Sequence, residues 1–145
     1  MFATRLRYLD DPRQINYVKD GWNFPGDTFT QDADGHFFFQ ARADDMIITA
    51  GYNVAGPEVE EALMAHPAVA ECAVVGAPDA ERGMIIKAFI VLKENKVGDA
   101  VMIKTLQEHV KSMLAPFKYP RQIEFLSVLP RTETGKLQRF KLRQA

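Results

Sequence analysis

The sequence predicts an α+β protein, with a small mixed sheet flanked by helices and preceded by short strands and loops. Two observations indicate this class. From residue 57 onward the apolar pattern reads as helix, strand, strand, helix and strand, an order typical of a small α+β sandwich. Residues 1–36 are instead rich in Asp, Gly and Pro and lack helical periodicity, which indicates loops and short strands.

Short apolar runs predict two strands ahead of the first helix. Asp32–His36 is a turn signal, and a strand over Phe37–Gln40 is expected to follow it. Another short strand is expected over Met46–Thr49. Between these strands lies the charged stretch Arg42–Asp45, which is either a surface turn or a joint between two bodies.

A first helix is expected to begin at Gly56-Pro57, because Pro is favoured at the first helical position. Glu58, Glu60 and Glu61 complement the positive end of the helix dipole. Val59 and Leu63 lie four residues apart and give the helix an apolar stripe, and His66-Pro67 ends it.

The apolar runs Val69–Val75 and Ala88–Leu92 predict two strands, with a loop over Gly76–Asp79 after the first of them. Cys72, the single cysteine, lies in the first run, so we expect a buried and unreactive thiol rather than a nucleophile. A single cysteine excludes an intrachain disulfide and is typical of a reducing compartment.

A second helix is expected after Asp99, whose side chain suits the N-cap position. Pro116 ends this helix. A strand over Ile123–Leu126 and a short helix within Leu137–Leu142 complete the chain. The second helix has apolar residues at helical spacing, namely Ile103, Leu106, Val110 and Met113.

The composition restricts the function classes. The 145 residues are 47% hydrophobic and 26% charged, which suits one compact domain with an appendage. The net charge of -1 argues against a nucleic-acid binder. No apolar stretch approaches the ~20 residues of a membrane span, and Met1–Arg5 lacks a signal-peptide layout, so we expect a cytoplasmic protein.

Residues 117–145 are locally basic, with seven Lys or Arg against two Glu, a balance of +5. Within them, Pro130–Leu137 places a Gly-Lys pair in a Thr-rich loop, which suits a phosphate site around Lys136. It is no Walker A loop, because Pro130 and Leu137 stand where Gly and Ser or Thr are needed. An exposed turn on a solvated face is the alternative.

Two further segments suggest ligand contacts. Asp27, in the loop Asp20–Asp27, is suited to accept hydrogen bonds from a diol such as ribose, or to cap a turn. In Arg42–Glu60, Gly51 and Gly56 bracket a polar and aromatic loop past which a thin ligand fits. A hairpin followed by a capped helix is the simpler interpretation of that segment.

The order and spacing of these segments resemble the adenylate-forming (AMP-binding) superfamily of acyl-CoA synthetases, peptide adenylation domains and luciferases. Gly21–Asp27 is similar to its Gly-Trp-x-x-Thr-Gly-Asp motif, with Pro25 in place of Thr. Arg42–Glu60 is similar to its hinge motif, with Ala41 in place of the usual preceding Gly. Pro130–Lys136 matches its Pro-x-Thr-x-x-Gly-Lys motif without departure.

The resemblance implies roles for single residues. Asp27 binds the ribose of ATP or AMP, and Arg42 lies near the ribose and phosphates. Asp44 is the hinge of a small lid domain. Lys136 reaches the carboxylate and the α-phosphate during adenylation, and Gly51 lines the pantetheine tunnel of coenzyme A after the lid has turned.

The same resemblance places the coenzyme A nucleotide near Phe117 and Arg121, through stacking and a phosphate contact. Tyr119 departs from the family there, since that position is often basic. No metal ligand is assigned in this chain, and Mg²⁺ is expected with the large domain.

The resemblance also implies a domain division. Residues 1–43 correspond to the end of the large N-terminal domain, which is the expected partner, and residues 44–145 to the C-terminal lid. The chain is therefore expected to be a C-terminal fragment of an ATP-dependent carboxylic acid:CoA ligase, inactive alone. The local sequences around Tyr17–Trp22 and Gly51–Asn53 are most similar to those of ligases for benzoate, 2-aminobenzoate and medium-chain acids.

Three alternatives stay open. The chain is an adenylation lid that serves a carrier-protein thiol, a stand-alone module that binds a nucleotide or a partner without catalysis, or a folded remnant without function. A large domain encoded directly upstream favours the ligase over the last two alternatives.

Overall fold

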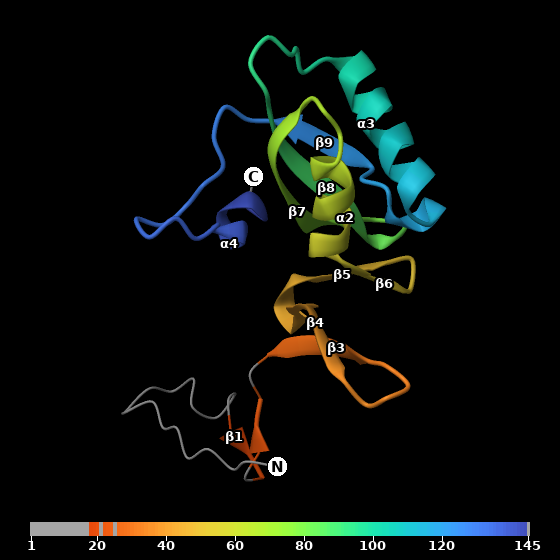
Figure 1. Cartoon of the computed structure of the whole chain (residues 1–145), viewed down its shortest axis with the longest axis vertical. Helices are drawn as coiled ribbons and strands as arrows, with labels where there is room; N and C mark the ends of the chain where they lie inside the picture. The colour runs from red at the N-terminus through yellow and green to blue at the C-terminus, as the bar shows by residue number, and fades with distance from the viewer. Residues whose placement is uncertain (1–17, 21, 25, 145) are drawn as a thin grey trace. The chain divides into compact units, whose positions relative to one another are not determined.

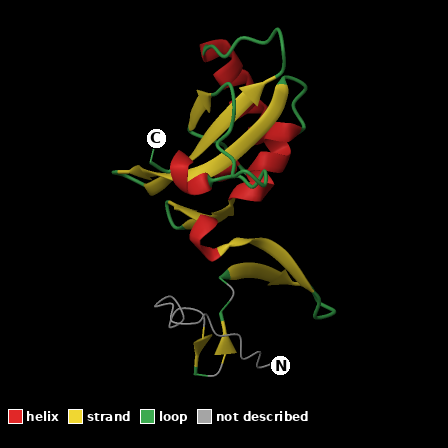
Figure 2. Ribbon diagram, turned by 90° about the vertical axis from the view of Figure 1, so that its left-hand side faces the viewer, coloured by secondary structure: helices red, strands yellow, loops and turns green. Residues whose placement is uncertain are grey.

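The computed structural model describes residues 18–20, 22–24 and 26–144 (Figure 1). Helices and strands appear in Figure 1 by label and in Figure 2 by colour. The chain divides into two compact units, with the division between Asp44 and Asp45. The two units are described one at a time.

The described part of the first unit consists of paired strands. β1 (Val18–Lys19) pairs antiparallel with β2 (Trp22–Asn23), and β3 (Asp27–Gln31) pairs antiparallel with β4 (Phe37–Arg42). The expected turn and the strand after it are confirmed, although the strand continues to Arg42. The motif residues Gly21 and Pro25 lie outside the described residues.

A 3-10 turn, η1 (Ala43–Asp45), follows β4, and the division between the units falls within it. Of the charged stretch Arg42–Asp45, Arg42 therefore ends β4 and the other three residues form this turn, at which the two units divide.

A five-stranded mixed sheet forms the second unit, in the order β6-β5-β8-β7, with β9 also beside β8. All neighbours are antiparallel except β8 and β9, which are parallel. The confirmed α+β class rests on this sheet and its helices. The strands are β5 (Met46–Thr49), β6 (Tyr52–Ala55), β7 (Val69–Asp79), β8 (Gly83–Leu92) and β9 (Gln122–Phe125).

The helices begin where local signals predict them. α2 (Gly56–Met64) has its Pro in the first turn. α3 (Ala100–Met113) is capped by Asp99, whose Oδ1 accepts from the Met102 amide at 2.8 Å. A 3-10 turn, η2 (Pro116–Lys118), and a last helix, α4 (Arg139–Leu142), complete the second unit.

Both faces of the sheet are covered. Alternate residues of β7 point to opposite faces, so that Val74 packs with Leu63 of α2 and Leu106 of α3. Ala73 packs on the other face with Leu142 of α4 and other residues of the C-terminal segment. Figure 1 accordingly shows α3 and α4 on opposite sides of the strands.

The loop expected over Gly76–Asp79 is wrong, because these residues continue β7 and pair with the start of β8. β7 lies at the sheet edge, where Pro78 needs no N–H for a ladder. The chain instead reverses after Asp79, whose Oδ1 accepts from the amides of Glu81 and Arg82 at 3.1 and 2.9 Å.

Met113, the last of the four apolar residues at helical spacing, is 51% exposed. Leu106 and Val110 are fully buried, and the residue that continues their apolar stripe is Leu114, the C-cap residue just beyond α3, which packs against the core. The stripe therefore passes from Val110 to Leu114, four residues on, instead of to Met113.

None of the helices in the part of the chain that the structure describes is long and apolar enough to cross a membrane.

Candidate functional site

In the first unit, Asp27, Arg42 and Asp44 lie together. Asp27 opens β3 and faces Arg42, the last residue of β4, across the antiparallel pair. The Arg42 Nε lies 3.5 Å from Asp27 Oδ1 and 3.6 Å from Asp44 Oδ1. The guanidinium is half exposed between two carboxylates, so this cluster presents both signs of charge to a ligand.

Lys136 lies at the end of a tight turn formed by residues 132–136, which we call the Lys136 turn. The Thr132 amide donates to the Lys136 carbonyl at 2.8 Å, and the Lys136 amide donates to Thr132 Oγ1 at 3.0 Å. Gly135 has φ +82°, a conformation that favours glycine. The backbone of the turn is thus fixed by its own Thr and Gly residues.

The Lys136 side chain is exposed. Among the residues that the structure describes, no carboxylate lies within ion-pair distance of its Nζ. An unneutralised ammonium on a rigid turn is suited to meet an anion from outside the unit.

Gly51 forms a two-residue turn with Ala50 between the paired residues Thr49 and Tyr52 of β5 and β6. Both turn residues have positive φ, 49° for Ala50 and 82° for Gly51, as hairpin turns of this length require. A Cβ placed on Gly51 would meet no atom within 4 Å. Glycine therefore leaves bare, accessible backbone at the tip of this turn.

Phe117 lies beside that hairpin, because its ring stacks on Tyr52 with centroids 4.4 Å apart and an interplanar angle of 18°. Lys118 binds Glu58 of α2 at 2.7 Å and holds η2 in place. The stack supports one side of the Phe117 ring. No motif indicated a role for Tyr52, whose only signal in the sequence is an aromatic side chain directly after Gly51.

Arg121 contacts a different part of the second unit. Its guanidinium lies 5.1 Å from the centre of the Tyr119 ring, and Lys111 Nζ lies 4.4 Å from the same centre. Tyr119, the position that departs from the family pattern, therefore interacts with two cations. Phe117 contacts the β5–β6 hairpin, whereas Arg121 is associated with α3 through this ring.

The Lys136 turn and the Gly51 turn belong to opposite sides of the second unit. In Figure 1 the segment between β9 and α4 extends on the left, and the turn between β5 and β6 lies on the right. The second unit therefore offers two separate surfaces.

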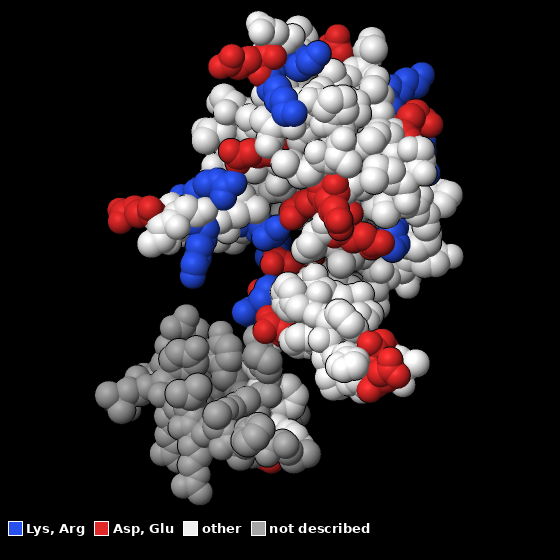
Figure 3. All heavy atoms as spheres, in the orientation of Figure 1, with Lys and Arg blue, Asp and Glu red and all other residues white. Residues whose placement is uncertain are grey.

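The basic tail is not a uniform patch. Four of its cations bind carboxylates, in the pairs Lys118–Glu58, Arg131–Glu71, Arg139–Glu60 and Arg143–Asp45. Figure 3 shows Lys and Arg atoms interspersed with Asp and Glu atoms on this side of the unit. The arginines hold the tail to the body, and Lys136 stays available.

Cys72 is unsuited to nucleophilic chemistry. Its Sγ donates to the Glu60 carbonyl at 3.4 Å, and burial raises the pKa of the thiol to about 12. The neighbouring Glu60 carboxylate acts in the same direction. The thiol therefore stays protonated at neutral pH.

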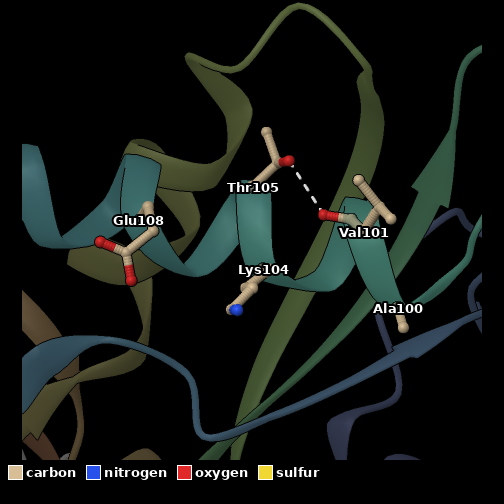
Figure 4. Close-up of a pocket in the computed structure, with 5 residues that line it drawn as sticks. All are labelled: Ala100, Val101, Lys104, Thr105 and Glu108. Carbon is tan, nitrogen blue, oxygen red and sulfur yellow. Dashed lines mark hydrogen bonds between the residues drawn. The ribbon is translucent and has the colours of Figure 1, made fainter.

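Two other features, a surface hollow and an acidic cluster, do not form a binding site. A hollow along the outer face of α3 is lined by residues of that helix alone, with the Thr105 hydroxyl bonded to the Val101 carbonyl at 2.9 Å (Figure 4). Asp32, Asp34 and His36 bring their ligand atoms within 4.8 Å of one another. Asp32 Oδ1 accepts from the amides of the other two, which accounts for this cluster as a turn.

Comparison with known proteins gives the following similarities. A family model described as AMP-binding enzyme C-terminal domain matches residues 58–136. The uncharacterized acyl-CoA ligase YtcI of Bacillus subtilis is 44% identical over 143 residues, 98% of this chain and 27% of the relative. The human mitochondrial acyl-coenzyme A synthetase ACSM2A is 49% identical over 140 residues, 94% of this chain and 24% of the relative.

Among solved structures, the anthranilate CoA ligase AuaEII, in complex with anthranoyl-AMP, is 42% identical with a TM-score of 0.79. The similarity covers 92% of this chain and 26% of that one. The chain thus spans about a quarter of the length of the curated relatives it matches.

Proposed function

The chain belongs to the family of AMP-binding enzyme C-terminal domains, and from this we propose that it is the C-terminal part of a longer carboxylic acid:CoA ligase. That enzyme joins a carboxylic acid to ATP, giving acyl-AMP and pyrophosphate. It then transfers the acyl group to the thiol of coenzyme A and releases AMP. The observation that carries the proposal is the exposed, unpaired ammonium of Lys136 on a fixed turn.

Lys136 acts in the first half-reaction. Attack of the substrate carboxylate on the α-phosphorus increases the negative charge on the phosphoryl oxygens, and the bond to pyrophosphate breaks. A compact ammonium close to these oxygens stabilises the developing charge and orients the carboxylate. Because no carboxylate among the described residues neutralises Nζ, its charge is available for this task.

The Gly51 turn acts in the second half-reaction. The thiol of coenzyme A attacks the acyl carbon, and AMP leaves with the bonding electrons. Bare backbone at Gly51 lets the thin pantetheine arm pass, and the supported ring of Phe117 is suited to stack on the coenzyme A nucleotide. Arg121 meets one of its phosphates.

Asp27 and Arg42 bind the nucleotide from the first unit. Asp27 Oδ1 lies near Arg42, and the second carboxylate oxygen of Asp27 is suited to accept hydrogen bonds from ribose hydroxyls. Arg42 faces the phosphates. Residues 1–43 form the end of the large domain, with Asp44 as hinge for the lid of residues 44–145. Mg²⁺ is expected to bind with ATP on the large domain.

The acid is proposed to be aromatic or of medium chain length. Two observations support this: the local sequence of the hinge motif, and the similarity to AuaEII, a ligase for anthranilate. A cytoplasmic location stays a prediction, since the similar human enzyme ACSM2A is mitochondrial.

The proposal is tested by Lys136→Ala in the longer ligase. ATP–pyrophosphate exchange is expected to fall by about a hundredfold or more, because the charge at the α-phosphate is lost. Thioester formation from supplied acyl-AMP is expected to stay within about twofold. Lys104→Ala, on the exposed face of α3, is the matched control. Equal losses in both half-reactions would contradict the assignment.

A further inference from the structure

The Lys136 turn is connected to the sheet through one guanidinium. Arg131 Nη1 donates to the carbonyl of Gly135 at 2.9 Å, and its Nη2 donates to Glu71 Oε2 on β7 at 2.7 Å. Gly135 directly precedes Lys136. The same planar group therefore contacts the turn and the strand beneath it.

We propose that Arg131, anchored by Glu71, is a positioning residue that sets the place of Lys136 relative to the sheet. The inference rests on the proposed function of Lys136 in adenylation. It adds two residues to which the family resemblance assigned no role, since position 131 is a variable position of the terminal motif.

The hydrogen bonds among residues 132–136 lie within the turn, so they do not fix its position relative to the sheet. The turn therefore needs an anchor such as Arg131. Thr132, Thr134, Gly135 and Lys136 bond to one another and fix the shape of the turn. At the base of the turn, Arg131 and Leu137 form an antiparallel β-bridge. The Leu137 side chain packs against the apolar cluster that contains Ala73 and Leu142. Within the described chain, the Arg131–Glu71 pair is the ion pair that joins this turn to β7.

Arginine is the residue this task requires. Its planar fork donates in two directions at once, to a carbonyl and to a carboxylate. A lysine in its place keeps the charge but carries all its donors on one nitrogen, which is unsuited to reach both acceptors. Arg131→Lys therefore removes the bridge while leaving the net charge unchanged.

The Arg139–Glu60 ion pair provides a comparison, because its role is purely structural. Arg139 binds both oxygens of Glu60 at 2.8 Å, and Glu60 also accepts from the edge amide of Val74. Those side chains are 26% and 17% exposed, against 43% and 48% for Arg131 and Glu71. The Arg139 pair holds α4 to the body, whereas the exposed Arg131 pair contributes little to stability.

The first measurement is amide exchange by NMR on the 145-residue chain. In Arg131→Lys and in Glu71→Ala, the amides of Gly135 and Lys136 are expected to exchange on the order of tenfold faster. Amides of β7 and β8 are expected to keep their rates. The control is Glu108→Gln, which breaks the exposed Glu108–Lys111 pair on α3. Unchanged exchange at Gly135 and Lys136 in both variants would overturn the proposal.

The second measurement separates the two half-reactions in the longer ligase. Arg131→Lys is expected to lower kcat for adenylation about tenfold to a hundredfold, with the KM for ATP little changed. Thioester formation from acyl-AMP and the unfolding midpoint should stay as in the Glu108→Gln control. A merely structural role would instead lower the midpoint and both half-reactions together.

The two proposals fail in different ways. If Lys136→Ala adenylates normally, the proposed function fails. If Lys136→Ala loses adenylation while Arg131→Lys keeps it, only the positioning role fails. Loss of adenylation in both variants, with faster exchange in the Arg131→Lys turn, supports the positioning role.

Discussion

At the scale of single residues, the cations of the basic tail differ in whether a carboxylate neutralises them. Arg131 and Arg139 each bind a carboxylate on the body of the second unit, and their planar donors fix geometry. Lys136 has no such partner among the described residues and points a compact charge outward. The sequence predicted the excess of positive charge and the place of Lys136, but not which cations are neutralised.

The neutralised cations could not be predicted because the acidic partner of each arginine lies far from it in the sequence. Glu71 and Glu60 belong to β7 and α2, and only the folded sheet brings them to the tail. Tyr52 and Phe117 meet in the same way, through packing that no local spacing indicates.

His66 provides a residue-scale prediction about pH. Burial, then the nearby charges of His109 and Lys96, lower the pKa of His66 in the folded state below its usual value. Its Nδ1 accepts from the Ala68 amide at 3.2 Å, a bond that protonation removes. The unfolded chain therefore binds this proton more readily, and the free energy of unfolding falls as pH drops below about 6.5.

Urea unfolding at pH 7.5 and at pH 5 measures this effect. His66→Asn keeps an acceptor for the Ala68 amide and is expected to reduce the loss of stability at the lower pH. His36→Asn, in the first unit, is the control. An equal loss in wild type and His66→Asn would show that other groups cause it.

At the scale of elements, the helix starts were predictable, whereas the end of β7 and the start of β8, at Gly83 instead of the predicted Ala88, were not. Helix signals are local, such as the Pro at the start of α2 and the Asp99 cap of α3. The extension of β7 through Gly76–Asp79 depends on pairing with β8, and its edge position tolerates Pro78. A turn signal in the sequence was therefore overridden by long-range pairing.

The α3 cap gives an element-scale prediction. Asp99→Ala removes the acceptor of the Met102 amide and is expected to lower the free energy of unfolding by about 1 kcal/mol. Asp99→Asn keeps an acceptor oxygen and is expected to stay within about 0.5 kcal/mol of wild type. Chemical denaturation measures both variants. An equal loss in both would assign the effect to charge instead of the cap.

At the scale of the whole molecule, the second unit is built on one sheet and carries two separate turns, the Lys136 turn and the Gly51 turn. Helices α2 and α3 cover one face of the sheet and the C-terminal segment covers the other, so these elements pack into one body. The Lys136 turn and the Gly51 turn lie on its opposite sides (Figure 1). Such a body cannot present both turns to one reaction centre at once, which suits a two-step reaction with a hinge.

Crossed variants of the proposed longer ligase test most directly whether the two turns serve different half-reactions. We compare Lys136→Ala with Gly51→Leu, and use Gly51→Ala as the control that carries the same left-handed backbone strain without the bulk. Lys136→Ala is expected to lose only adenylation, and Gly51→Leu only thioester formation from acyl-AMP. Loss of the same half-reaction in both variants would show that the two turns do not serve separate steps.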